Sequence, residues 1–206
     1  MTELRTGLPG SAGEHMLQRD LGFDARAARF YREQMLDRLN ERMAEFVGRQ
    51  EMMFVATADA RGECDCSFRA GPPGFVHVLD ERTLVYPEYR GNGVMGSLGN
   101  ISGNGHAGLI FVDFLTHLIG LHVNGTAEVL ADADLLKLWP DRPEADIPGR
   151  RARLWVRVGV EEAYIHCAKH IPWLMKMPRH RRWGAEDTRA KGGDFFDVKG
   201  EERPWT

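Results

Sequence analysis

The chain has 206 residues, a length typical of one domain with short appendages, and 43% of them are hydrophobic, which is enough for a folded core. Its formal net charge of −3 provides no global basic field, so the composition does not favour nucleic-acid binding. No apolar run is long enough to cross a bilayer, and the polar N-terminus lacks a hydrophobic signal core. We therefore expect a cytoplasmic protein with neither nucleic-acid nor membrane partners.

Composition divides the chain into three parts. Residues 1–23 are polar and glycine-rich and are predicted to be a flexible leader, whereas 178–206 is a charged extension rich in arginine and glycine. The folded domain is predicted to cover 24–177. It begins with a helix over 24–47, where apolar residues recur every three or four positions, with Asp24 as N-cap and Gly48 at its end.

After this helix the pattern changes to short strands joined by tight turns. A turn at 59–62 predicts a hairpin, and the Gly-Pro-Pro-Gly segment at 71–74 interrupts the ladder. Strands are predicted at 52–57, 63–68, 75–79, 83–86, 108–114, 121–129 and 154–160, with short helices at 94–101 and 135–139. Close spacing of the strands favours antiparallel neighbours in a barrel or sandwich.

A glycine-rich loop over 90–98 carries the clearest functional signal. Its three glycines let backbone N–H groups approach an anion, and the helix that follows adds aligned peptide dipoles. Arg90 supplies a forked cation and Ser97 a hydroxyl. The loop is predicted to bind phosphate.

The same loop matches the dinucleotide pattern G-x-G-x-x-G at 91–96, with Asp113 downstream. That match suggests an NAD-dependent dehydrogenase. However, four residues separate the loop from its strand, the following helix is short, and long helices do not alternate with strands. The dehydrogenase is therefore kept only as an alternative.

No metal site is predicted. The three cysteines, Cys64, Cys66 and Cys167, lack the second pair that a structural zinc site needs, and an odd number argues against a disulfide framework. His106, His117 and His122 show no metal-ligand spacing and are taken as structural.

Five segments, taken together and in order, resemble the pyridoxamine 5′-phosphate oxidase-like family of flavin-binding proteins. They are residues 54–59, 66–76, 90–101, 121–127 with its Asn-Gly pair, and 164–169 with its His-Cys-x-Lys sequence. The resemblance implies a mainly β (α+β) fold: a split β-barrel of Greek-key antiparallel strands with an N-terminal helix and short peripheral helices. It also implies a homodimer with FMN at the dimer interface.

The resemblance also implies which residues contact FMN. They are Arg69, Arg90, Asn92, Gly93, Val94, Ser97 and Lys169, with Lys169 reaching the cofactor across the dimer. Competing interpretations stay open: Asn92 and Ser97 could serve the turn and the helix cap, and Arg69 could pair with Asp65 or Glu63. Trp155, Trp173 or Trp183 could stack on the isoalloxazine ring or pack in the core.

The predicted function is an FMN-dependent oxidoreductase that passes electrons between a reduced donor and a small organic acceptor. No catalytic acid or base is predicted. Departures from the oxidase pattern at 93–95 and 203–206 argue against vitamin B6 phosphate as the substrate. The main alternative is a non-catalytic protein that binds or stores flavin or haem, with His166 or His170 as a haem ligand.

Overall fold

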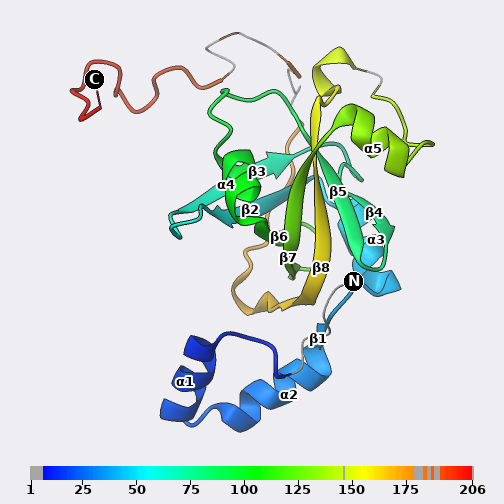
Figure 1. Cartoon of the computed structure of the whole chain (residues 1–206), viewed down its shortest axis with the longest axis vertical. Coiled ribbons are helices and arrows are strands. Elements are labelled where there is room, and N and C mark those ends of the chain that lie inside the picture. Colours follow the sequence, from blue (N-terminus) through cyan, green and yellow to red (C-terminus); the bar gives the residue numbers. More distant parts are fainter. Residues whose placement is uncertain (1–6, 146, 179–182, 185–186, 188–190, 206) are drawn as a thin grey trace.

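The computed structural model describes residues 7–145, 147–178, 183–184, 187 and 191–205. Its centre is one sheet in the order β3-β2-β6-β7-β8-β5-β4, with β1 added to β8, and each recorded strand pair is antiparallel (Figure 1). The strands are β1 (Met35–Leu36), β2 (Met52–Ala58), β3 (Cys64–Ala70), β4 (His77–Asp80), β5 (Thr83–Glu88), β6 (His106–Asp113), β7 (Ile119–Ala131) and β8 (Leu154–His166). The predicted mainly β, antiparallel split-barrel fold is confirmed.

The described residues also form five α-helices and two short 3₁₀ helices. They are α1 (Ala12–Asp20), α2 (Asp24–Gln34), α3 (Glu41–Arg49), α4 (Gly96–Asn104), α5 (Asp132–Leu138), η1 (Pro148–Arg150) and η2 (Ala168–His170). Helix α4 lies beside β2 and β3, whereas α1 and α2 stand apart from the sheet beyond β1 (Figure 1). In the part of the chain that the structure describes, no helix combines the length and apolarity needed to span a membrane.

The core forms because side chains alternate between the two faces of each strand. Along β2, every second residue from Met53 to Thr57 is buried, and β8 repeats the pattern from Val156 to Val160. The Asp59 hairpin forms as predicted, since Gly62 donates to the Asp59 carbonyl at 3.0 Å and β2 and β3 pair along their length.

The single helix predicted over 24–47 is wrong. The chain leaves the helix at Met35–Leu36 and pairs with Tyr164 and Ala163 of β8, and α3 then starts after Asn40. Asn40 caps α3 by accepting from the Met43 N–H at 2.9 Å. The apolar stripe does not reveal this break, because its three- and four-residue spacing continues across positions 35 and 36 in the sequence, although no residue of α2 is buried.

The leader predicted to be flexible over 1–23 contains α1. Ser11 and Glu14 form a capping box there, in which each side chain accepts from the other residue's backbone N–H. The Ser-x-x-Glu spacing could have predicted this helix. None of the residues in α1 or α2 is buried, so the two helices add little to the core.

Candidate functional site

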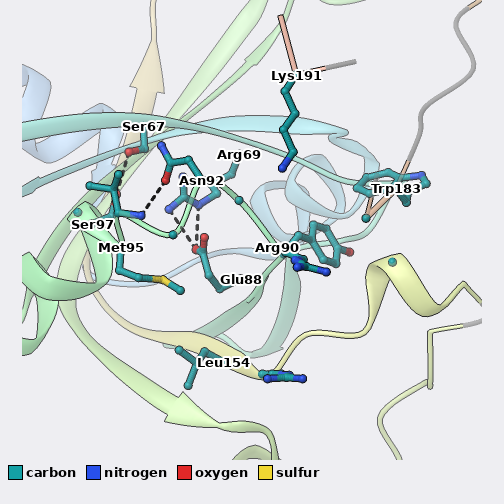
Figure 2. A pocket seen from close by; sticks show the side chains of 18 of the residues that line it. Ser67, Arg69, Glu88, Arg90, Asn92, Met95, Ser97, Leu154, Trp183 and Lys191 are labelled. Carbon is teal, nitrogen blue, oxygen red and sulfur yellow. Dashed lines mark hydrogen bonds and ion pairs between the residues drawn. The ribbon is translucent and has the colours of Figure 1, made fainter. Parts of the chain in front are cut away.

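A cavity of about 1170 Å³ opens beside the loop that joins β5 to α4. Figure 2 shows Ser67 and Ser97 toward one end, Arg90 and Trp183 toward the other, and Glu88 between them. Among the described residues that line the cavity, five are basic (Arg69, Arg90, Arg151, Arg153 and Lys191) and two are acidic (Asp65 and Glu88). This excess of positive charge suits an anionic ligand.

The loop that lines the cavity has left-handed backbone at two positions. Gly93 has a φ of 85°, and Met95, the N-cap of α4, has a φ of 58°. The first recorded helical bond of α4 runs from the Gly99 N–H to the Met95 carbonyl, and no side chain caps this end of the helix. The N–H groups of the first turn are therefore available to an anion in the cavity, as at other helix N-termini.

Asn92 stabilises the loop. Its carboxamide oxygen accepts from the Val94 N–H at 2.9 Å, an Asx turn that fixes the approach to α4. This is the turn role that the sequence left open, and it leaves the Asn92 NH₂ group as the donor that could face a ligand.

Ser97 does not cap the helix; it is buried and belongs to a hydrogen-bonded cluster on Asp65. The Ser97 hydroxyl lies 3.0 Å from an Asp65 carboxylate oxygen, and the Ser67 hydroxyl lies 2.8 Å from the same oxygen. The two hydroxyls are 2.8 Å apart. This cluster ties α4 to β3 and fixes one end of the cavity.

Arg69 pairs with Glu88, not with Asp65 or Glu63 as the sequence suggested. Two guanidinium nitrogens lie 3.1 Å from one carboxylate oxygen of Glu88, across the gap between β3 and β5 (Figure 2). The two side chains are 19% and 15% exposed. Burial raises the pKa of Glu88 above its ordinary value, although the Arg69 charge works in the opposite direction.

Six of the seven predicted cofactor residues line this one cavity: Arg69, Arg90, Asn92, Gly93, Val94 and Ser97. Lys169 does not line it, because Lys169 lies in η2, beyond the C-terminal end of β8, whereas the cavity touches β8 at its first residue, Leu154. A role for Lys169 here therefore requires a second copy of the chain.

Of the three candidate tryptophans, only Trp183 lines the cavity, where its ring meets that of Tyr89 edge to face at 5.3 Å. Trp155 is buried and donates to Asp132, and Trp173 is exposed and donates to the Leu115 carbonyl. Neither His166 nor His170 lines the cavity.

Several lining residues were not predicted. Glu88 lies just before the glycine-rich loop but was given no role. Arg151, Arg153 and Lys191 come from segments with no motif, and Lys191 belongs to the charged extension over 178–206. Arg151 and Arg153 are two positions apart, so in an extended segment both side chains can lie on the same face. This spacing was the signal from which the two arginines could have been predicted to share a site.

Comparison with known families matches residues 39–167, more than half of the chain, to the model described as "Pyridoxamine 5'-phosphate oxidase". Comparison with curated proteins finds no match. The G-x-G-x-x-G alternative is wrong, since the loop lies between an antiparallel strand and a short helix instead of within a parallel βαβ unit.

Solved structures with a similar fold include HupZ from Group A Streptococcus, at 23% identity and a TM-score of 0.45, covering 62% of this chain and 93% of that one. A candidate pyridoxamine 5′-phosphate oxidase from Lactobacillus delbrueckii has 24% identity and a TM-score of 0.47, covering 64% and 98%. HutZ, the haem storage protein from Vibrio cholerae, has 12% identity and a TM-score of 0.40, covering 62% and 94%. Similarity at this level carries no statement about what this chain binds.

Proposed function

Because this chain belongs to the pyridoxamine 5′-phosphate oxidase family, we propose that it binds FMN in the cavity beside residues 90–97 and passes electrons between a reduced donor and a small organic acceptor. The observation that carries this proposal is the cavity itself. Glycine-bearing backbone, the uncapped start of α4 and an excess of basic side chains meet there.

In this proposal the FMN phosphate lies against the first turn of α4. The N–H groups of Gly96 and Ser97 and the Arg90 guanidinium would hold it, and Asn92 would keep the loop in its binding conformation. This donor set fits a phosphate, since it combines backbone amides with a fixed cation.

The remaining walls would orient the ring system. Trp183 lines the cavity and would pack against a planar ring. The Arg69 guanidinium would lie near that ring, with its charge largely balanced by the Glu88 carboxylate. The bound flavin would supply hydride transfer, while these residues supply position and electrostatics.

A homodimer is part of the proposal. The partner's Lys169 would enter the cavity of this chain. Lys169 could then contact FMN even though it does not line the cavity of its own chain.

Arg90→Ala tests the phosphate assignment. The variant loses the side-chain cation at the loop, so we expect FMN to dissociate with a Kd about tenfold or more higher than that of the wild type. Titration of flavin-free protein, followed by flavin fluorescence quenching, measures this Kd. Arg61→Ala is the control, since Arg61 is an exposed arginine at the β2–β3 turn, outside the cavity.

Wild-type protein that takes up no FMN would contradict the cofactor assignment, and an unchanged Kd for Arg90→Ala would remove Arg90 from the phosphate site. An oxidoreductase should also have its flavin bleached by a reduced nicotinamide or another reductant.

A flavin binder without turnover is the second candidate. Both carboxylates of the described cavity wall already have partners: Asp65 accepts from two serine hydroxyls and Glu88 pairs with Arg69. Neither is therefore an unpaired acid or base for catalysis, which favours this second candidate. A stable flavin complex that no physiological reductant bleaches would select this candidate over the enzyme.

A further inference from the structure

Two histidines that are 44 positions apart in the sequence meet on the outer side of β7 and β8. His122 Nε2 lies 3.0 Å from His166 Nδ1. Neither residue lines the cavity of its own chain. Figure 1 shows the two strands that carry the pair running side by side through the middle of the sheet.

The register of the two strands allows this contact. His122 lies opposite Tyr164 and His166 lies opposite Gly120, so the two histidines are diagonal neighbours. Diagonal positions are about 7–8 Å apart, which is within reach of aromatic side chains. A Cβ at Gly120 would lie only 2.8 Å from the His166 Cβ, so a side chain there would take the space beside His166. Glycine at 120 therefore leaves the His166 side chain room beside β7.

The His122 ring is also held in place from its other side. The Tyr164 ring stacks on it with centroids 4.7 Å apart and planes 15° apart, and Phe30 of α2 packs edge to face on Tyr164. Asn124 and Glu162 form the next polar pair along the two strands, and the Asn124 NH₂ group donates to the Glu162 carboxylate at 3.3 Å. The imidazoles thus lie in a partly covered, ordered environment that has a carboxylate nearby.

We propose that His122 and His166 form a two-histidine binding site for a divalent transition-metal ion of the copper(II) or nickel(II) class. Imidazole nitrogens suit these ions. With metal–nitrogen bonds of about 2.0–2.1 Å, a nitrogen separation of 3.0 Å gives an angle of about 91–97° at the metal. That angle fits the tetragonal geometry of copper(II) and nickel(II) better than the wider angle of tetrahedral zinc.

The two facing nitrogens are joined by a hydrogen bond, so one of them carries a proton. Metal binding requires this proton to move to the outer nitrogen of its ring, which leaves the two protons on His122 Nδ1 and His166 Nε2. Among the described residues no group of three or more histidine, cysteine or acidic ligands is present, so water would fill the remaining positions on the metal.

The test is isothermal titration of the tag-free full-length chain with NiCl₂. We expect one saturable equivalent per chain. His122→Asn and His166→Asn should each weaken it by about tenfold or more, since even an indirect partner of a metal ligand is worth about 10–100-fold. His106→Asn is the matched control because His106 is an exposed histidine near the far end of the same sheet, and it should bind as the wild type does. No saturable binding by the wild type, or wild-type affinity in either β7–β8 variant, would overturn the proposal.

Electron paramagnetic resonance of the wild-type protein with one equivalent of copper(II) gives an answer that does not depend on the variants folding. Hyperfine structure from two equivalent nitrogens in a tetragonal field supports the site, whereas a spectrum with one nitrogen or only oxygen ligands overturns it. Because FMN binding is not measured in either experiment, this result stands apart from the outcome of the Arg90 test.

Discussion

At the scale of single residues, the pairing of Arg69 with Glu88 decides the electrostatics of the cavity wall. Glu88 is the more buried of the two side chains, and its carboxylate is kept charged against the cost of burial by a guanidinium 3.1 Å away. Removing only the arginine would leave a largely buried carboxylate without its cationic partner.

Arg69→Ala should therefore lower the free energy of unfolding by about 1–3 kcal/mol at pH 7.5. An acid whose pKa is raised in the fold favours the folded state when it is protonated and loses that advantage as the pH rises through the raised pKa. In Arg69→Ala this pKa rises further, so the loss of stability should shrink when the pH is lowered to 5. Urea unfolding at the two pH values measures it.

The double variant Arg69→Ala/Glu88→Gln is the control for this interpretation. It has no ionisable group at position 88, so it should not show the extra pH dependence. An equal loss at both pH values in the single variant would mean that packing of the Arg69 side chain, and not the Glu88 charge, is responsible.

At the scale of elements, the turn between β6 and β7 depends on one carboxylate. Asp113 accepts from the N–H groups of Leu115, Thr116 and His117 and from the His117 ring, at 2.9–3.0 Å. Partial burial would raise the pKa of Asp113, but these donors outweigh it and lower the pKa to about 2. The same turn binds the C-terminal segment, because the Leu174 N–H donates to the Phe114 carbonyl.

Asp113→Ala should destabilise the fold by about 1–3 kcal/mol at pH 7, because several backbone donors lose their acceptor. A depressed pKa means that the wild type gains this stability above the ordinary aspartate pKa and loses it as the pH falls from about 4 to 2. Acid unfolding followed by circular dichroism should thus be flatter over that interval in the variant. Asp134→Ala, which removes an exposed carboxylate from α5, should behave as the wild type does.

At the scale of the whole molecule, we propose that the flavin site is shared between two chains. The cavity meets β8 at Leu154, and Lys169 follows the opposite end of this 13-residue strand. One chain cannot bring both to the same ligand in this fold, whereas a symmetric pair can exchange them.

Lys169→Ala should accordingly raise the Kd for FMN severalfold, although the residue lies outside its own chain's cavity, because a cation near the cofactor is lost. Lys137→Ala, an exposed lysine on α5 paired with Asp134, is the control. Sedimentation of the wild type should give twice the mass of one chain, with one FMN bound per chain. A monomer that binds FMN with full affinity would contradict the shared site.

Local patterns in the sequence were enough to predict much of this protein. The hairpin at 59–62, the strand at β2, the alternating strands β7 and β8, and the glycine loop before α4 are all present, because each depends on neighbouring residues and, for β7 and β8, on the two-residue period of a strand. The grouping of Arg90, Asn92 and Ser97 could be predicted for the same reason, since they lie in one continuous turn.

Contacts between distant segments were decided only by the tertiary structure. The partner of Arg69, the serine cluster on Asp65 and the meeting of His122 with His166 each depend on strand order and register, which local propensity does not specify. The break at Met35–Leu36 has the same origin, since pairing with β8 outweighs a helical preference that the sequence carries locally. The sequence by itself therefore determined the strands and the loop, and packing of the sheet determined which side chains share a site.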